Sequence, residues 1–515
     1  MRIYNTWSRR KEEFIPIKAG EVGFYVCGPT VYNHIHIGNA RTFISFDVIR
    51  RYLEFRGFAV RFVQNITDVD DKIINRAQEL GSTPEAVAAE YTEAFRAAMR
   101  AIGVREPTVQ PKATEELAAM IDLISRLVDA GHAYQVDGDV YFAVRSFAAY
   151  GRLSGRDIDQ LLSGARVEID ERKRDALDFA LWKAAKPGEP AWESPWGLGR
   201  PGWHIECSAM SRRYLGESFD IHGGGEDLIF PHHENEIAQS LASGPGQFAR
   251  YWLHGGMLTI NDAKMSKSEG NYLLLKDVLG HVRPAALRLL MLQSHYRSPF
   301  DYSPQRLEEA GAALLRVENA LRNLEWAAEA GGVGGWSEAE ERAELAEVTG
   351  SENPTVQLLA LVEKAESRLI EQMDDDFNTA AAVAALFELI SAANVNIASV
   401  AGGLLDRAHA VAARITARRI RGLFAVLGIE LAEAGEAGAE APANELPAAL
   451  AAEVEALLGA SGLNTEQATE ALLALRAEAR ANKDWQLADK IRDIFNGLGL
   501  VIEDTAQGTR VYPQE

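Results

Sequence analysis

Two short runs, far apart in the chain, hold residue types suited to a substrate that carries phosphate. The run HIGN at residues 36–39 lies between a predicted strand and a predicted helix, where backbone N–H groups and the helix dipole favour an anion. The run KMSKS at residues 264–268 sets two lysines beside hydroxyl groups, which suits the charge of a leaving pyrophosphate. Taken singly, the first run also fits an ordinary surface loop, and the second also fits a solvated basic turn.

Cysteine, histidine and carboxylate residues supply a candidate metal site. Cys27 follows the first predicted strand, Cys207 lies in GWHIECSAM, and His232 and Glu236 stand one helical turn apart in HGGGEDLIFPHHENE, whose glycines would let a ribose approach. Two thiolates, an imidazole and a carboxylate are a set that zinc accepts. No CxxC pair is present, so two buried, inert thiols and an unrelated His/Glu pair fit the same residues.

The elements around these residues predict a doubly wound parallel sheet. Residues 21–27 form an apolar run typical of a buried strand, residues 39–56 have helical apolar spacing that ends at Gly57, and residues 59–66 are rich in strand formers. Such a strand–helix–strand unit places the carboxyl ends of its strands, and therefore Cys27 and the HIGN run, at the ligand crevice.

Other elements follow from periodicity and turn residues. An Asp137-Gly138 turn between residues 134–136 and 139–142 predicts a hairpin. Helices are expected within 71–130, and an irregular insertion continues up to residue 199. Long helices are expected at 305–329, 355–400 and 406–427, with a glycine loop at 331–335. An acidic linker at 430–447 precedes terminal helices to 498 and a strand pair at 500–504 and 509–512.

Composition restricts the class of protein. The 515 residues carry a net charge of −21, which by itself favours an enzyme of small molecules over a nucleic-acid partner unless a basic surface is hidden in the acidic average. The chain starts without the apolar stretch of a signal peptide and shows no run of about 18–20 apolar residues, so we expect a cytoplasmic protein with no membrane partner.

Longer stretches resemble cysteinyl-tRNA synthetases, a family of class I aminoacyl-tRNA synthetases. The resemblance runs from about residue 1 to 512 and is weakest across 331–352 and the acidic linker. In the first class I signature, Asn39 stands where the family pattern has His; Asn keeps a donor, so we expect the function to survive. The matching stretches are CGPTVYNHIHIGNART (27–42), NITDVDDKII (65–74), LDFALWKAAKPGEPAWESPWG (177–197), GRPGWHIECSAMS (199–211), FPHHENEIAQS (230–240), KMSKSEGN (264–271) and VIEDTAQGTR (501–510).

The resemblance implies a fold, a reaction and its partners. The fold is a Rossmann-type catalytic domain with an insertion, followed by a helical bundle and a small C-terminal α/β domain. The substrates are ATP, L-cysteine and tRNA(Cys): cysteine attacks the α-phosphate to give cysteinyl-adenylate, and the 2′-hydroxyl of the terminal adenosine then attacks the adenylate carbonyl. We expect Mg²⁺ with ATP, one zinc ion per chain that selects the cysteine thiolate over the hydroxyl of serine, and a monomer.

Residue roles also follow from the resemblance. A four-ligand zinc site is often purely structural, but the place of Cys27 beside the phosphate loop favours a catalytic ion. The implied roles are zinc ligation by Cys27, Cys207, His232 and Glu236; catalysis by His36, Asn39, Lys264 and Lys267; further ATP contacts by Gly38, Gly225 and Asp227; an amino-acid pocket of Thr67, Trp203 and Asp227; and anticodon recognition by Arg480, Trp485, Asp489 and Asp504.

Two further features concern contacts with tRNA. Five arginines between residues 407 and 421 form a basic helix that suits either phosphate contact or solvation. Val511 stands where the family often has Trp, which removes one stacking contact.

The resemblance also implies a domain division. The expected boundaries are the catalytic domain at 1–118 and 200–245, a connective insertion at 119–199, a stem-contact region with KMSKS at 246–304, a helical tRNA-binding domain at 305–430, an acidic linker at 431–447 and an anticodon-binding domain at 448–515.

Two rival functions remain. The first is a cysteine ligase of the mycothiol pathway, which joins cysteine to an amino-sugar and lacks the terminal domain that WQLADKIRDIFNGLGLVIEDTAQGTR (485–510) predicts here. The second is a non-catalytic RNA-binding paralogue, which predicts a broken HIGN or KMSKS run, whereas here only Asn39 departs.

Overall fold

The computed structural model describes residues 1–156, 172–260, 263–264, 272–346, 348–350, 353–400, 406–432, 454, 457, 465–482, 484–497, 500–505 and 508–513. Packing divides the chain into two compact units. The first comprises residues 1–315, 365–387 and 422–430, and the second comprises residues 316–364, 388–421 and 431–515.

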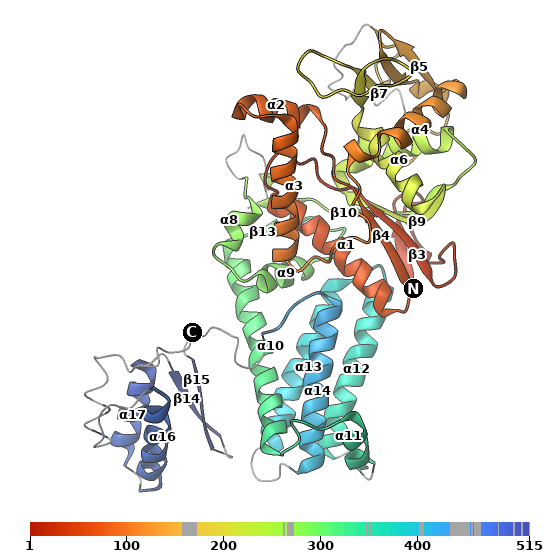
Figure 1. Ribbon diagram of the computed structural model, residues 1–515. Coiled ribbons are helices and arrows are strands. Elements are labelled where there is room, and N and C mark those ends of the chain that lie inside the picture. The colour runs from red at the N-terminus through yellow and green to blue at the C-terminus, as the bar shows by residue number, and fades with distance from the viewer. Residues whose placement is uncertain are drawn as a thin grey trace. The chain divides into compact units, whose positions relative to one another are not determined.

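A four-stranded parallel sheet forms the centre of the first unit (Figure 1). Its order is β10 (Phe248–Gly255), β9 (Ser218–Gly225), β3 (Glu21–Val26) and β4 (Ala59–Gln64), and each neighbouring pair runs parallel. This confirms the predicted doubly wound sheet. All four strands therefore end at one edge, which places the residues after β3 and β9 together.

Helices cover both faces of this sheet. Successive side chains of a strand point to opposite faces. Phe24 packs edge-on against Phe46 of α1 (Ile37–Phe55), with ring centroids 5.9 Å apart. Tyr25, on the opposite face, joins a buried cluster with Ile205 and Cys207 of α6 (Trp203–Leu215). The continuous apolar run in β3 thus reflects a strand buried on both faces.

The helices predicted within residues 71–130 are confirmed, and there are three of them in this range. They are α2 (Asp71–Leu80), α3 (Pro84–Ala101) and α4 (Leu117–Asp129). The side chains of Asp70 and Thr83 cap α2 and α3. Between α3 and α4 the chain runs extended beside β4. Parallel bridges join residues 63 and 66 to residues 109 and 112, so this segment adds a short parallel edge to the central sheet.

The insertion contains an antiparallel sheet in the order β5 (Ala133–Val136), β6 (Asp139–Phe142), β7 (Phe179–Ala184) and β8 (Gly199–Pro201). The predicted hairpin is confirmed, because β5 pairs with β6 and both turn residues have positive φ, 52° at Asp137 and 87° at Gly138. Residues 157–171 of the insertion lie outside the described residues.

The remaining elements of the first unit frame the sheet. Strands β1 (Arg2–Asn5) and β2 (Arg10–Glu13) form an N-terminal hairpin, and α7 (Glu234–Ala242) packs against α6 and β10. A small sheet orders β12 (Ala263–Lys264), β11 (Leu258–Ile260) and β13 (Phe300–Tyr302), and α8 (Leu275–Leu279) and α9 (Pro284–Leu292) lie in the chain between β12 and β13.

Four long helices follow: α10 (Pro304–Ala330), α12 (Pro354–Asp374), α13 (Thr379–Val400) and α14 (Arg407–Val426). The prediction of one helix over 355–400 is wrong, because α12 and α13 are separated by a break at residues 375–378. Asp376 and Phe377 have positive φ values of 68° and 53°. The Asp376 carboxylate accepts hydrogen bonds from Tyr4 N–H (2.8 Å) and Arg297 Nε (2.8 Å), and these contacts hold the strained break.

The second unit contains one helix that the periodicity did not predict, α11 (Glu338–Leu345). Its N-terminus is a capping box, since the Ser337 hydroxyl accepts from Glu340 N–H and the Glu340 carboxylate accepts from Ser337 N–H. The sequence SEAE at 337–340 carries that signature, and the glycine loop before it obscured the helix.

The C-terminal part forms a small α/β layer by itself. Helices α16 (Thr465–Ala481) and α17 (Trp485–Gly497) precede an antiparallel pair, β14 (Leu500–Thr505) and β15 (Gly508–Pro513). Its core includes Leu472, Ile491 and Phe495. This confirms the predicted helices and strand pair, whereas residues 433–447 of the predicted linker lie outside the described residues.

A buried cation fixes α9 in the first unit. Arg288 is 1% exposed; it pairs with Asp47 of α1 and donates to the carbonyls of Leu427 (2.8 Å) and Ile102 (3.2 Å). We expect Arg288→Met to lower the free energy of unfolding by about 3 kcal/mol, because the buried Asp47 carboxylate keeps only one of its two arginine partners, Arg51, and two carbonyls lose their donor. Urea unfolding followed by circular dichroism measures the loss.

The matched control is Arg10→Ala, which removes an arginine whose side chain is 77% exposed and pairs only with Glu12 at the surface. That change should cost less than about 1 kcal/mol. Equal losses in the two variants would contradict the role given to Arg288.

Candidate active site

The HIGN run forms a capped turn at the start of α1. His36 is the N-cap residue: its Nδ1 accepts from Asn39 N–H at 3.2 Å, and the Asn39 side-chain oxygen accepts from His36 N–H at 3.2 Å. Burial lowers the pKa of His36 to about 4, so the ring is neutral at pH 7. With Nδ1 accepting, the proton lies on Nε2, which leaves a neutral donor at the helix N-terminus.

One cavity of about 250 Å³ gathers many of the predicted residues. His36 and Asn39 line it together with Gly225, the last residue of β9, with Asp227 shortly after that strand, and with Trp203 at the start of α6. Cys27 opens into the same cavity. The structure thus brings together the predicted phosphate loop, part of the predicted amino-acid pocket and one predicted metal ligand.

A close backbone approach explains the residue after Cys27. A Cβ on Gly28 would lie 1.6 Å from the carbonyl oxygen of Asn65, and Gly28 N–H donates to the Asn65 side chain at 2.8 Å. By contrast, the space beside Gly223 and Gly224 is filled by Phe46 and His233. Of that glycine run, only Gly225 faces the cavity.

The four predicted metal ligands converge in the interior next to this cavity, and Cys27 of the four also lines it. Cys27 Sγ lies 3.7 Å from Cys207 Sγ and 3.5 Å from Glu236 Oε1, and His232 Nε2 lies 3.2 Å from the same oxygen. All four donor atoms lie within 4.8 Å of one another, and all four side chains are buried. Donors around a tetrahedral zinc ion stand about 3.3–3.8 Å apart, so the spacing fits this ion.

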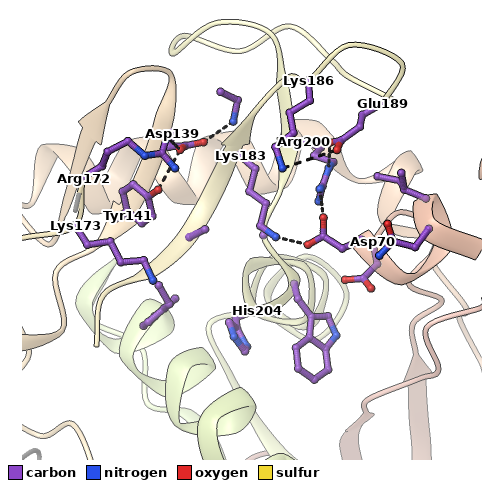
Figure 2. A pocket seen from close by; sticks show the side chains of 18 of the residues that line it. Asp70, Asp139, Tyr141, Arg172, Lys173, Lys183, Lys186, Glu189, Arg200 and His204 are labelled. Carbon is purple, nitrogen blue, oxygen red and sulfur yellow. Dashed lines mark hydrogen bonds and ion pairs between the residues drawn. The ribbon is translucent and has the colours of Figure 1, made fainter. Parts of the chain in front are cut away.

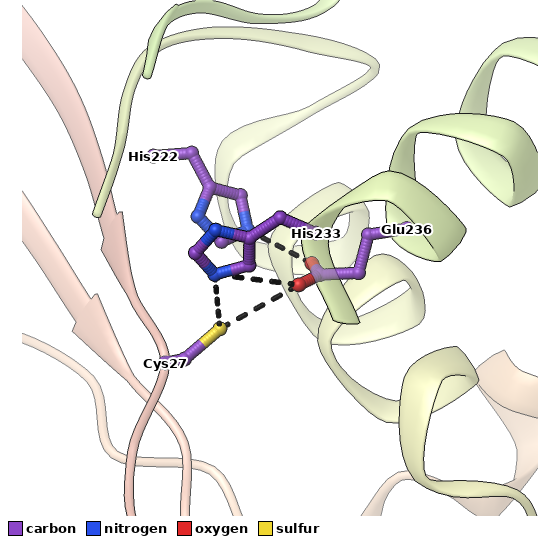
Figure 3. A group of neighbouring side chains, drawn as sticks. All are labelled: Cys27, His222, His233 and Glu236. Atoms are coloured by element: carbon purple, nitrogen blue, oxygen red, sulfur yellow. Dashed lines mark hydrogen bonds and ion pairs between the residues drawn. The ribbon is translucent and has the colours of Figure 1, made fainter. Parts of the chain in front are cut away.

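Two more histidines form a second, overlapping donor set (Figure 3). It combines Cys27 and Glu236 with His222 of β9 and His233, which precedes α7. Figure 3 shows the His222 ring directed toward the Glu236 carboxylate and the His233 ring directed toward both that carboxylate and the Cys27 sulfur; His222 Nε2 lies 2.8 Å from Glu236 Oε2, and His233 Nε2 lies 3.4 Å from Cys27 Sγ. The sequence run contains both histidines, but neither was given a role.

The electrostatics of this cluster favour a cation. Burial raises the pKa of Cys27 well above its ordinary value, and the neighbouring Cys207 and Glu236 raise it further. Burial also raises the pKa of Glu236. The anionic forms of Cys27 and Glu236 are therefore disfavoured here without a positive partner. A divalent ion would lower both pKa values and so favour the anionic forms.

Histidine hydrogen bonds continue away from the cluster. His233 Nδ1 lies 2.7 Å from His254 Nε2, and His254 Nδ1 lies 2.8 Å from Thr6 Oγ1. On the other side, His232 Nδ1 lies 2.9 Å from His204 Nδ1. These contacts fix the ring orientations of His232 and His233.

His254 gives a pH-dependent prediction. Burial lowers its pKa to about 3, so the folded protein holds it neutral, whereas the unfolded chain protonates it below about pH 6.5. Above about pH 6.5, His254 is neutral in both the folded and the unfolded wild-type protein. Below about pH 6.5 the unfolded chain takes up a proton that the folded protein does not, so the free energy of unfolding falls as the pH falls. His254→Gln should be less stable than wild type at pH 7.5, and the difference should shrink by about 2 kcal/mol at pH 5.

Urea unfolding of metal-free wild type and variant at both pH values measures this change. His281→Gln, at an exposed position on the same unit, serves as the control and should show no pH-dependent difference. A difference between wild type and His254→Gln that stays constant from pH 7.5 to pH 5 would contradict the prediction.

The other predicted site residues lie in different surroundings. Thr67 is not among the residues that line the cavity; its buried hydroxyl donates at 2.6 Å to Oε2 of Glu206, which lies on α6. Gly38 lies in the first turn of α1. Lys264 ends β12, and Lys267 lies outside the described residues.

Comparisons with known proteins give the family. Residues 13–312 match the family model described as tRNA synthetases class I (C) catalytic domain, residues 368–432 match a DALR domain, and residues 465–512 match a cysteinyl-tRNA ligase anticodon binding domain. The chain is 49% identical over 514 residues to the cysteine–tRNA ligase of Heliobacterium modesticaldum and 48% identical over 512 residues to that of Geobacter metallireducens, with 99% of each chain covered.

This chain belongs to the cysteine–tRNA ligase family. The predicted resemblance is confirmed along the whole chain. A solved methionyl-tRNA synthetase of Mycobacterium tuberculosis, in a structure with methionyl-adenylate, shares the fold with a TM-score of 0.57 at 17% identity, covering 80% of this chain and 92% of the other. The chain matches cysteine–tRNA ligases over their full length and also matches the anticodon binding domain. These matches give no support to the rival function, a cysteine ligase that acts on an amino-sugar.

Within this cysteine–tRNA ligase, the predicted anticodon residues lie on the C-terminal layer. Trp485 begins α17 and is 57% exposed, with the Arg480 guanidinium 5.9 Å from its ring centroid. Asp489 pairs with Arg492 at 3.0 Å. Asp504 lies in β14 opposite Thr509. An exposed indole beside an arginine is a surface on which an unpaired base can stack.

The basic helix of the ligase, α14, uses most of its arginines within the second unit. Arg414 and Arg418 both contact the Glu341 carboxylate, at 2.5 and 3.0 Å, and Arg421 contacts Glu325 at 2.7 Å. Arg407 lies 5.9 Å from the Trp336 ring centroid. These contacts favour a structural role for the helix over phosphate binding.

Among the residues that the structure describes, one helix is long and apolar enough to cross a membrane. The stretch Thr379–Ser399 of α13 has a mean hydropathy of 1.6, and half of it is buried within the protein. The core helix of a soluble protein can be equally long and apolar.

Proposed function

We propose that this ligase activates L-cysteine with ATP and transfers it to tRNA(Cys). The observation that carries the proposal is a buried set of two thiols, an imidazole and a carboxylate next to the cavity formed by the HIGN loop. A sulfur-preferring metal centre beside a phosphate site suits a substrate that carries a thiol and a carboxylate. We expect a monomer that acts in the cytoplasm, with Mg²⁺ accompanying ATP.

Cys27, Cys207, His232 and Glu236 would hold one zinc ion. We prefer this set to the overlapping one because it offers two sulfurs, which zinc favours, whereas the overlapping set offers one. The ion would supply Lewis acidity that favours a thiolate over a hydroxyl. His222 then orients Glu236 through its second oxygen.

The chain's own residues would arrange the remaining substrates. His36 Nε2 and Asn39 would donate to ATP phosphates, Lys264 and Lys267 would stabilise charge on the leaving pyrophosphate, and Asp227 would contact the ribose or the substrate amino group. Trp203 would pack on the amino acid, and Thr67 would shape the pocket through Glu206 rather than by direct contact. Gly38 and Gly225 would leave room for ATP.

We retain the expected domain division as part of this proposal. Residues 119–199 would be the connective insertion, residues 305–430 the helical tRNA-binding domain and residues 448–515 the anticodon-binding domain. Arg480, Trp485, Asp489 and Asp504 would read the anticodon by stacking and base-edge contacts.

The test is aminoacylation of total bacterial tRNA with labelled cysteine, with serine as the control amino acid. Cysteine on tRNA with serine rejected supports the proposal. Cysteine-dependent pyrophosphate exchange without charging of any tRNA would instead indicate an amino-sugar ligase, and the absence of both activities in zinc-loaded protein would indicate a non-catalytic paralogue.

A further inference from the structure

A lysine that has no part in the reaction as described above lines the cavity formed by the HIGN loop. It is Lys72, in the first turn of α2, where its backbone N–H donates to the capping side chain of Asp70 at 2.9 Å. Its Nζ lies 5.7 Å from the ring centroid of Tyr32 and 5.8 Å from that of Trp203, and both rings line the same cavity. The two rings therefore hold the ammonium group at the cavity wall by cation–π contacts.

The acidic residue that precedes Lys72 does not neutralise it. Asp71 lines a separate cavity of about 770 Å³ on the insertion side, where Lys183 Nζ lies 2.5 Å from its Oδ2 and Arg200 also contacts it. Figure 2 shows Lys183 and Arg200 in that cavity, each joined by a dashed line to a carboxylate. Lys72 is exposed and forms no ion pair with any residue that the structure describes. Its charge is therefore available to a ligand.

The charges on the wall of the HIGN cavity match those of a free amino acid. Among the described residues that line this cavity, Lys72 is the one lysine or arginine, and Asp227 is the one aspartate or glutamate. His34 and His36 also line it, but burial lowers the pKa of both rings, so they are neutral at pH 7. An α-amino acid carries one ammonium group and one carboxylate, which such a wall complements.

We propose that Lys72 binds the carboxylate of the substrate cysteine, which is the nucleophile of the activation step. This inference rests on the proposed function. Lys72 lies beside Trp203, the ring proposed to pack on the amino acid, and Asp227 is left to receive the amino group. Cys27, one of the proposed zinc ligands, lines the same cavity. The thiol, the amino group and the carboxylate of cysteine thus each have a partner there.

Contact with Lys72 positions the carboxylate without a proton transfer. One carboxylate oxygen forms a bond to the α-phosphorus of ATP, the bond from that phosphorus to its bridging oxygen breaks, and pyrophosphate leaves with the electron pair. The second oxygen stays beside the ammonium group and becomes the carbonyl oxygen of the adenylate. The carboxylate loses its negative charge as the new bond forms, so Lys72 holds cysteine more tightly before the reaction than in the transition state. Loss of Lys72 should therefore raise the KM for cysteine and change the maximal rate little.

The test compares zinc-loaded wild type and Lys72→Met in cysteine-dependent pyrophosphate exchange, with L-cysteine methyl ester as a competing ligand. The ester keeps the thiol and the amino group of cysteine but has no carboxylate charge. We expect the KM for cysteine to rise about tenfold, the effect of losing one charge-assisted hydrogen bond. The maximal rate, the KM for ATP and the inhibition constant of the ester should all stay within about twofold of wild type.

Two further variants are the controls. Lys72→Arg keeps the positive charge and should hold the KM for cysteine within about threefold of wild type. Lys18→Met removes a lysine of the same unit whose side chain is 72% exposed and pairs with Glu21 outside the cavity, and it should change none of these constants.

The other outcomes each overturn the inference. Equal weakening of cysteine and ester would mean that Lys72 shapes the pocket through the aromatic rings. A rise in the KM for ATP alone would place Lys72 at the phosphates, and unchanged constants would remove it from the site. Wild-type protein that neither exchanges pyrophosphate nor charges tRNA with cysteine would instead reject the proposed function, and the inference with it.

Discussion

Cys207→Ser should abolish zinc binding and cysteine activation together. The substitution replaces one sulfur donor of a buried four-donor cluster with a hydroxyl, which is a far weaker zinc ligand at neutral pH. We expect zinc to fall from about one ion per chain to near zero. Cysteine-dependent pyrophosphate exchange should fall on the order of 10³-fold, because the thiolate loses the group that selects it.

Metal analysis of the dialysed protein and the exchange assay together measure this effect. The matched control is Ser208→Ala, the adjacent position on α6, whose hydroxyl contacts Gln239 at 2.6 Å and is not part of the donor cluster. A Cys207→Ser protein that keeps stoichiometric zinc would reject Cys207 as a ligand and favour the overlapping set of Cys27, His222, His233 and Glu236.

Lys267→Ala should slow adenylate formation by about 10²–10³-fold, the usual effect of removing one preorganised donor from developing charge. The KM for cysteine should stay within about threefold, since the role proposed for this lysine is contact with the pyrophosphate and not with the amino acid. Steady-state pyrophosphate exchange measures both constants. Lys364→Ala, which removes an exposed lysine from α12, is the control and should leave both constants unchanged.

A different pattern would reject this role for Lys267. A rise in the KM for cysteine with an unchanged maximal rate would mean that Lys267 binds the amino acid in the ground state. An unchanged rate with an unchanged KM would assign the pyrophosphate charge to Lys264 alone.

The fold was predictable where local patterns and turn chemistry agree. The apolar run before Cys27, the helical spacing after it and the Asp137-Gly138 turn each predicted the observed element. The break between α12 and α13 was not predictable, because the positive φ values at Asp376 and Phe377 depend on contacts with Tyr4 and Arg297, far away in sequence. Periodicity reports only local preference.

Some residues of the candidate site were predictable from the sequence, and others became apparent only from the tertiary structure. Family resemblance selected Cys27, Cys207, His232 and Glu236 from separate segments, and the structure brings their donor atoms together. No spacing rule indicates that His222 also contacts Glu236, since fourteen residues separate them and a strand and a helix bring them together. The side chain of Thr67 is likewise directed toward Glu206 by tertiary packing.

The reciprocal hydrogen bonds between His36 and Asn39 change how mutations in this loop should be interpreted. Asn39 fixes the turn before any nucleotide arrives, so it lowers the conformational entropy that binding would otherwise remove. Alanine at position 39 would therefore slow the reaction even if Asn39 never touched a phosphate.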